Sequence, residues 1–205
     1  MRDTLNGKIT STKISAEKLF SLPICVIMEW VMKMDDKNKL PKRKHTRLDN
    51  YDYSSAGAYF VTICTQNRQC VLSCIVGRGL APAETTELEY TLFGEIAEKQ
   101  LFLLEDRFPY LAVDKYVIMP NHIHAIMILN GEAAGASPRP TITDIVCAYK
   151  SLTTKECKKN GLGEKLFQTS FYEHIIRGRV DYEEIAKYIY ENPIHWCYDE
   201  LYTKE

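Results

Sequence analysis

The chain has 205 residues, of which 45% are hydrophobic and 26% are charged, and its formal net charge at pH 7 is -1. These values are ordinary for a globular protein of one domain with an added arm or extension. A chain this close to neutral has no overall field that draws it to nucleic acid or to a membrane surface, so any such attraction must come from local charge.

The cysteines and the apolar segments indicate the compartment. The seven cysteines are an odd number without a CxxC pair, and Cys70 and Cys74 have no second pair to complete a zinc site. We expect reduced thiols. The apolar run at 19–32 is interrupted by Pro23 and Glu29 and falls short of the ~20 residues that a membrane-spanning helix needs. The sequence therefore predicts a cytoplasmic protein without a membrane contact.

Two segments precede the predicted domain. Residues 1–36 differ in composition from the rest of the chain, and we interpret them as an N-terminal extension that is poorly ordered or absent from the natural protein. Residues 37–56 form a basic arm, with Lys42, Arg43, Lys44 and Arg47 as candidate phosphate contacts. The alternative is a solvated linker. Residues 57–205 are expected to form a single domain.

The expected elements follow from β-branched runs, helical spacing and turn residues. In chain order they are a strand at 57–65, a short strand near 70–75, a loop at 76–90, a helix at 91–108, strands at 111–119 and 122–129, a loop at 130–140, a helix from Thr141 or Thr143 to 159, a strand at 166–176 and a helix at 180–192. The first helix places Leu92, Ile96, Leu101 and Leu104 near helical spacing. Pro193 is expected to stop the last helix.

This order of elements predicts a fold class. Strand, helix, strand, strand, helix, strand is the split βαβ order of ferredoxin-like folds. The prediction is an α+β fold, with a ferredoxin-like antiparallel sheet that carries helices on one face. The other face is left for the last helix, and the strand at 122–129 is expected to be central.

Two histidines stand in that central strand. His122 and His124 lie two residues apart in an otherwise apolar run, so their side chains should share one face of the sheet. Buried imidazoles need partners. A shared metal ion would satisfy both, and hydrogen bonds within the core are the alternative.

The last helix offers a second pair of polar residues. Ile185, Tyr188, Ile189 and Asn192 share a helical face that should point toward the protein. Because Asn192 precedes Pro193, we expect it at a frayed helix end, where its amide can turn to a ligand. The alternative is a core tyrosine followed by an asparagine cap.

These residues combine into one chemistry. Two imidazoles and the amide oxygen of Asn192 supply three metal ligands and leave other positions open for phosphate and water. Tyr188 would attack a phosphodiester and leave a phosphotyrosine with release of a sugar hydroxyl. Because the bond energy is kept in that ester, rejoining needs no nucleotide cofactor.

Several stretches, in this order along residues 43–197, resemble the single-tyrosine HUH transposases, and most closely the REP-associated tyrosine transposases. They are Gly57-Ala58-Tyr59-Phe60-Val61-Thr62 with Cys64-Thr65, Tyr116-Val117-Ile118-Met119-Pro120-Asn121-His122-Ile123-His124, Tyr149-Lys150-Ser151, Phe171-Tyr172-Glu173-His174-Ile175-Ile176-Arg177 and Tyr188-Ile189-Tyr190-Glu191-Asn192-Pro193.

The resemblance implies a metal-dependent enzyme that cleaves and rejoins single-stranded DNA near REP-like hairpins through a 5′-phosphotyrosine. It implies Tyr188 as the catalytic nucleophile, metal ligands His122, His124 and Asn192, and Mg²⁺ or Mn²⁺ as the ion. Lys150 and Arg177 become candidate DNA contacts beside the basic arm. The implied location is at nucleoid DNA in the cytoplasm, and a homodimer and a monomer both stay open.

Three rival functions remain. A domesticated transposase could be catalytically silent and act as a DNA hairpin-binding protein. A nucleotide hydrolase or transferase of the histidine-triad type needs a third histidine where this chain has Ile126. A metal-dependent hydrolase with water as nucleophile would not require the Tyr188 hydroxyl.

Overall fold

The computed structural model describes residues 52–76, 87–131 and 140–203. The predicted extension at 1–36 and most of the basic arm lie outside these residues. Lys42, Arg43, Lys44 and Arg47 are among those outside, so their contact with nucleic acid stays a prediction.

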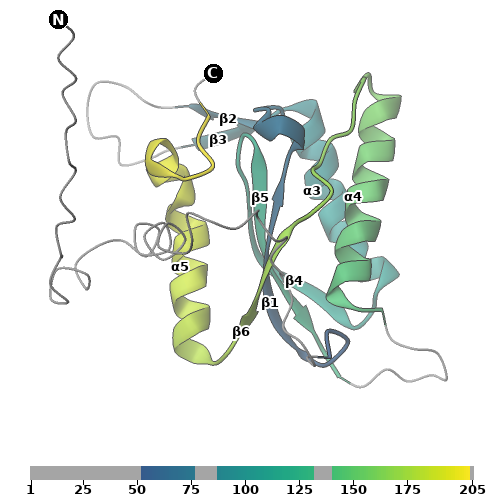
Figure 1. The fold of residues 1–205 in the computed structure, drawn as a ribbon, viewed down its shortest axis with the longest axis vertical. Helices are drawn as coiled ribbons and strands as arrows, with labels where there is room; N and C mark the ends of the chain where they lie inside the picture. The colour runs from purple at the N-terminus through teal and green to yellow at the C-terminus, as the bar shows by residue number, and fades with distance from the viewer. Residues whose placement is uncertain (1–51, 77–86, 132–139, 204–205) are drawn as a thin grey trace, which may run out of the picture. The chain divides into compact units, whose positions relative to one another are not determined.

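The central sheet has four antiparallel strands in the order β4-β5-β1-β6 (Figure 1). The strands are β1 (Gly57–Cys64), β4 (Leu111–Ile118), β5 (His122–Leu129) and β6 (Tyr172–Ile176). The predicted α+β fold with an antiparallel ferredoxin-like sheet is confirmed. The histidine strand β5 lies between β4 and β1, so its place inside the sheet is confirmed as well.

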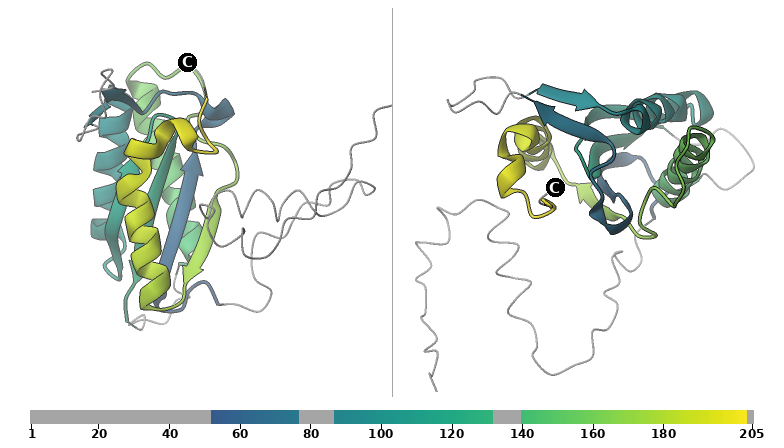
Figure 2. Two further views of the ribbon diagram at one scale, coloured as in Figure 1. Left: turned by 90° about the vertical axis from the view of Figure 1, so that its left-hand side faces the viewer. Right: turned by 90° about the horizontal axis from the view of Figure 1, so that it is seen from above.

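Helices cover the two faces of this sheet unequally. Figure 2 shows α5 (Arg179–His195) in front of one face and α3 (Leu92–Arg107) with α4 (Ile142–Lys159) behind the other. Both rear helices begin at threonine caps. The Thr91 side chain accepts a hydrogen bond from the Gly94 N–H, and Thr141 forms a capping box with Asp144.

The alternation of side chains along β5 divides the core in two. Ile123, Ala125, Met127 and Leu129 belong to the larger core, which α3 and α4 cover. Ile126 faces the other way, into a smaller core with Ile189 and Trp196 from the C-terminal part of the chain. His122 and His124 share the parity of Ile126, so both imidazoles lie on the α5 face.

Two strands and one side chain differ from the sequence predictions. Residues 87–90, predicted as loop, form strand β3 (Glu87–Tyr90), which pairs with β2 (Ser73–Val76) in a separate two-stranded sheet. Four residues are too few for a reliable alternation signal. The strand predicted at 166–176 is regular only from Tyr172, because residue 167 makes a single bridge to Thr65. Leu92, expected on the packed face of α3, is 53% exposed.

The last helix does not stop at Pro193. It continues to His195, and a 3-10 turn (Trp196–Tyr198) follows. A proline so close to the helix end removes one N–H bond, and the buried Trp196 anchors the chain beyond it. Asn192 is therefore a buried residue of the helix rather than its frayed end.

No helix among the described residues is long and apolar enough to cross a membrane.

Candidate metal centre and nucleophile

The two histidines lie side by side beneath α5. Their ring centroids are 4.4 Å apart, and neither side chain is more than 2% exposed. Burial lowers the pKa of His122 to about 3 and holds the pKa of His124 well below its usual value. Both imidazoles are therefore neutral near pH 7, which is the form that binds metals.

Hydrogen bonds fix which nitrogen of His122 is free. The Asn121 amide donates to the Leu201 carbonyl at 2.7 Å, so the oxygen of Asn121 faces His122, 2.8 Å from Nδ1. An amide oxygen only accepts, so Nδ1 carries the single proton of the neutral ring. Nε2 is then a bare acceptor, and it is buried without a hydrogen-bond partner.

Asn192 presents a second bare acceptor. Its amide nitrogen donates to Oδ2 of Asp199 at 2.8 Å, and the flipped amide would instead set an oxygen against this carboxylate. The amide oxygen of Asn192 is buried without a partner, and the side chain lies close enough to His122 to favour its protonated form. Buried acceptors without a donor are costly, and a cation between them removes the cost.

His124 is held from the neighbouring strand. Its Nδ1 lies 2.9 Å from the Thr62 hydroxyl, which stands opposite it in the β1–β5 register. This contact orients the ring and points Nε2 toward α5, as the outer hydrogen bonds of metal-binding histidines do.

Tyr188 reaches this group of side chains from α5. Its hydroxyl lies 3.3 Å from Nε2 of His124 and 3.4 Å from Oδ2 of Asp199. The ring meets Phe60 edge to face at 6.2 Å. Tyr188 is 42% exposed, whereas Ile189 and Asn192 on the same helix are buried. The phenol therefore stands at the rim, where a large substrate can reach it.

Asp199 is a residue that the sequence analysis missed. Its carboxylate and the histidine nitrogens lie within 4.8 Å of one another, close enough to hold one metal ion. The 3-10 turn places Asp199 there, since Trp196 at its start packs against His122 at 5.7 Å. An acidic residue seven positions after Asn192 was the only signal in the sequence, and it gives no indication of that turn.

The donor set suits a divalent ion. Two imidazole nitrogens, an amide oxygen and a carboxylate oxygen converge, and two of these acceptors are buried without partners. Imidazole with oxygen donors is compatible with Mn²⁺, and the oxygen donors with Mg²⁺. The residues therefore fit the predicted metal, with Asp199 added to His122, His124 and Asn192.

The remaining predicted DNA contacts do not join this centre. Lys150 belongs to α4, behind the other face of the sheet, and its ammonium donates to the Thr169 carbonyl at 2.8 Å. Arg177 is exposed just beyond β6. Thr62, beside His124, pairs with Tyr172 at the start of β6, so Arg177 lies roughly 15 Å farther along the strand.

Comparisons with known proteins give a relative and a structural neighbour. No family model matches the chain. An uncharacterised protein of Haemophilus influenzae is 31% identical over 176 residues, which cover 78% of this chain and 93% of that protein. A solved structure of a REP-associated tyrosine transposase bound to a REP hairpin is 21% identical in sequence to this chain. The matched region covers 75% of this chain and 77% of the transposase chain, with a TM-score of 0.51. The chain thus belongs to the family of the Haemophilus influenzae protein, and its fold is that of a REP-associated tyrosine transposase.

Proposed function

We propose that the protein is a metal-dependent DNA strand transferase that cleaves and rejoins single-stranded DNA through a tyrosine. One observation carries the proposal. The exposed Tyr188 hydroxyl lies 3.3 Å from Nε2 of His124, beside buried acceptors of His122 and Asn192 that lack partners. A nucleophile at the rim of a cation site is the arrangement that an in-line displacement at phosphorus needs.

The residues divide the work among themselves. His122, His124 and Asn192 would hold the ion, with the Asp199 carboxylate beside them. A bound Mg²⁺ or Mn²⁺ supplies a Lewis acid that polarises a phosphoryl oxygen and offsets charge as it develops. Imidazole ligands favour Mn²⁺ at least as much as Mg²⁺.

The covalent step is a transesterification. Oη of Tyr188 forms a bond to the phosphorus, and the bond from phosphorus to the 3′ oxygen of the preceding sugar breaks. The phenol proton passes to the Asp199 carboxylate, which the hydroxyl already contacts. The departing 3′ oxygen takes a proton from water. The 5′-phosphotyrosine retains the ester, so the reverse attack by a sugar hydroxyl rejoins a strand.

The proposed substrate is single-stranded DNA next to a short hairpin. The structural neighbour was solved with a REP hairpin, and the two chains share a fold. Lys42, Arg43, Lys44 and Arg47 of the arm are proposed phosphate contacts, together with Lys150 and Arg177. We place the protein with nucleoid DNA in the cytoplasm, as a homodimer or a monomer.

A covalent-adduct assay tests the proposal. The protein is incubated with Mn²⁺ and a hairpin-bearing single strand labelled on the 3′ side of the cleavage site, and a labelled protein band is sought after denaturation. Tyr188→Phe should abolish the band. Tyr190→Phe is the matched control, because Tyr190 lies on the same helix and is 79% exposed. It should keep the band.

The outcomes separate the rival functions. Binding of the hairpin strand without any adduct would favour a catalytically silent hairpin-binding protein. Hydrolysis that survives Tyr188→Phe would indicate a water-based nuclease. A band that persists in Tyr188→Phe and disappears in Tyr190→Phe would identify Tyr190 as the nucleophile and contradict the proposal.

A further inference from the structure

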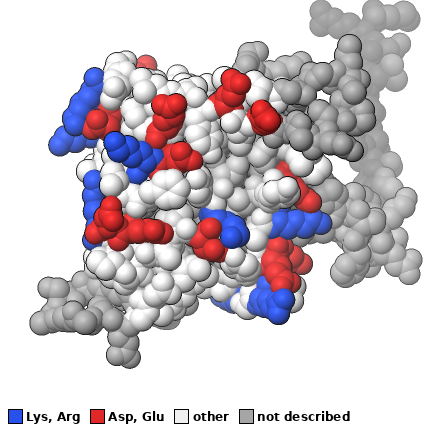
Figure 3. All heavy atoms as spheres, turned by 180° about the vertical axis from the view of Figure 1, so that it is seen from behind, with Lys and Arg blue, Asp and Glu red and all other residues white. Residues whose placement is uncertain are grey.

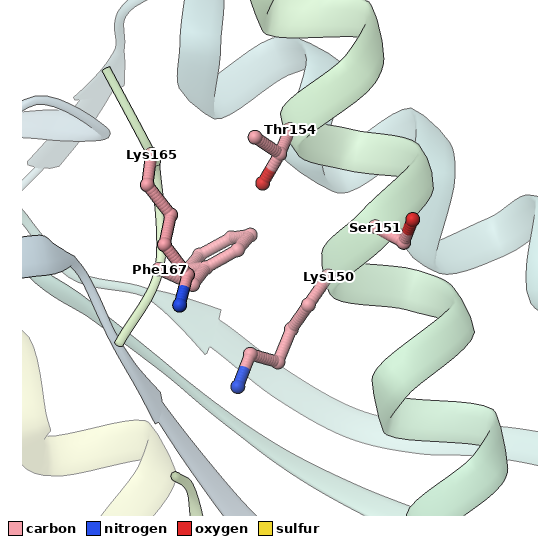
Figure 4. Close-up of a pocket in the computed structure, with 5 residues that line it drawn as sticks. All are labelled: Lys150, Ser151, Thr154, Lys165 and Phe167. Atoms are coloured by element: carbon pink, nitrogen blue, oxygen red, sulfur yellow. The ribbon is translucent and has the colours of Figure 1, made fainter. Parts of the chain in front are cut away.

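A pocket lies on the side of the sheet away from Tyr188. It has a volume of about 210 Å³ and is lined by Lys150, Ser151, Thr154, Lys165 and Phe167. Figure 4 shows the Lys150 and Lys165 side chains reaching from α4 and from the facing segment into the space between them. Two hydroxyl residues on α4 complete the wall. The lining therefore combines cations, hydroxyls and one aromatic ring.

The two lysines of this pocket share a partner that carries no charge. Lys150 donates to the Thr169 carbonyl at 2.8 Å, and Lys165 donates to the Thr169 hydroxyl at 2.9 Å. Within residues 52–76, 87–131 and 140–203, no carboxylate lies at ion-pairing distance from either ammonium. Burial lowers the pKa of Lys150, and the charge of Lys165 lowers it further. An anion is the counter-charge that this pair lacks.

The start of β6 connects this pocket to the nucleophile. β6 is an edge strand, so its residues lie at the rim of the sheet. As in any strand, successive side chains point to opposite faces. Tyr172 faces the α5 side, 44% exposed, and meets Phe60 at 6.5 Å. Phe171 faces the α4 side, where the Lys150 ammonium lies 5.8 Å from its ring. One aromatic ring is thus presented on each side of the edge.

A chain of contacts runs across this edge. Tyr188 and Tyr172 both meet Phe60 edge to face, at 6.2 Å and 6.5 Å. Phe171 precedes Tyr172 and contacts Lys150. Aromatic rings that can stack on bases, followed by cations that can hold phosphates, are the surface that proteins use to bind single-stranded nucleic acid.

Another face of the molecule lacks such an arrangement. Figure 3 shows acidic and basic side chains of the described residues intermingled on the face seen from behind, without a patch of one sign. A phosphate backbone would meet repulsion as well as attraction there. The β6 edge, with Lys150 and Lys165 near it on the α4 side, is the better path.

We propose that a single strand held at Tyr188 crosses the β6 edge, stacks a base on Tyr172 and places a backbone phosphate between Lys150 and Lys165. This inference rests on the proposed function, because it takes the cleaved strand as the ligand. It names the route of that strand and a phosphate subsite that lies apart from the metal centre.

Salt-dependent binding of a labelled dT20 oligonucleotide tests the route. All proteins carry Tyr188→Phe, so that binding is measured without covalent capture. Lys165→Gln should weaken binding and reduce the slope of log K against log salt by about 0.7, the value for one phosphate contact on a single strand. Lys165→Glu should weaken binding further. Lys165 is exposed, so neither change removes a buried side chain.

Two further variants complete the design. Tyr172→Leu should weaken dT20 binding by about 5-fold or more, with an unchanged salt slope, because it removes stacking and no charge. Lys155→Gln is the control, because this exposed lysine also belongs to α4 and does not line the pocket. It should leave the slope as in the parent.

Equal slopes for Lys165→Gln and Lys155→Gln would overturn the phosphate subsite. Unchanged affinity in Tyr172→Leu would overturn the crossing at β6. If the parent fails to bind dT20, the route fails as a whole. The covalent-adduct assay with Tyr188 intact decides the proposed function separately, so the two failures can be told apart.

Discussion

The hydroxyl of Tyr188 lies 3.3 Å from Nε2 of His124, although 64 residues separate the two in the chain. The contact forms because β5 directs its even-numbered side chains to the face that α5 covers. It joins a solvent-accessible phenol to a buried imidazole.

Loss of either histidine should abolish metal binding and leave the fold intact. His122→Ala and His124→Ala each remove a ligand, so the covalent adduct should disappear while the far-UV circular dichroism spectrum is retained. With Mn²⁺ at 100 times its Kd, the parent should gain about 2.7 kcal/mol in free energy of unfolding. Both variants should gain none.

His195→Gln is the matched control for the histidine variants, because His195 is exposed at the end of α5. It should respond to Mn²⁺ as the parent does. Near-parental adduct formation by His122→Ala or His124→Ala would show that these residues are not the ligands.

The metal-free protein should lose stability in mild acid. The pKa of His122 falls from about 6.5 in the unfolded chain to about 3 in the folded protein. Between these values the unfolded state binds a proton that the native state lacks. The contribution of His122 to the free energy of unfolding is therefore complete above about pH 6.5. Below about pH 6.5 the free energy of unfolding should fall by about 1.4 kcal/mol per pH unit because of this group.

Urea unfolding in EDTA at pH 7, 6 and 5 measures this loss. His122→Gln should show a shallower decline than the parent, because one buried imidazole no longer resists protonation. His124, whose pKa is also lowered by burial, should account for part of the decline that remains. Parallel curves for parent and variant would contradict the assignment.

Asp199→Ala should weaken Mn²⁺ binding without unfolding the protein. The carboxylate holds the Asn192 amide at 2.8 Å and contributes an oxygen near both histidines. Partners that orient metal ligands are worth about 10- to 100-fold in affinity. Isothermal titration should show at least that loss. Glu200→Ala, a change at the exposed neighbouring residue, should bind as the parent does.

Gly94→Ala should destabilise the fold although it lies in a helix. A Cβ at Gly94 would stand 2.0 Å from the Leu72 carbonyl oxygen, so the helix and the chain beside it must separate. Overpacking of this kind costs about 1–3 kcal/mol. Alanine gains only about 1 kcal/mol over glycine in helix propensity, so the net change should be a loss.

Thermal denaturation measures that loss, with Gly163→Ala as the control. A Cβ at Gly163 would have no neighbour within 4 Å. A rise in stability for Gly94→Ala would mean that α3 can move away from Leu72 at little cost.

Local patterns account for most of what the sequence predicted. The His-x-His spacing in a strand dictates a shared face, so that face was predictable. The amphipathic run after Thr141 predicted a helix but left Thr141 and Thr143 open as its cap, and the structure has Thr141. The predicted helix stop at Pro193 was wrong, because the burial of Asn192 and Trp196 on either side offsets the single lost hydrogen bond. Local preference indicated a stop, and tertiary packing prevailed.

The candidate metal centre was predictable from the sequence only in part, for a similar reason. His122, His124, Tyr188 and Asn192 are brought together by regular elements, whose geometry follows from periodicity. Asp199 is placed by an irregular turn whose course depends on the packing of Trp196 against His122. The placement of Lys150 and Lys165 in one pocket likewise depends on the irregular segment after α4, whose course follows from no regular sequence pattern.

The hydrogen bond from Asn121 to the Leu201 carbonyl makes the geometry of the candidate site depend on the docking of a short C-terminal segment, residues 199–203. If residues 199–203 detach in a local opening, Asn121 is no longer held with its oxygen toward Nδ1 of His122. Asn192 then also loses the Asp199 carboxylate that orients it, while the sheet stays folded. Occupancy by the ion and closure of that segment must then reinforce each other reciprocally. Ion-free molecules should exchange amide hydrogens fastest at these distal positions.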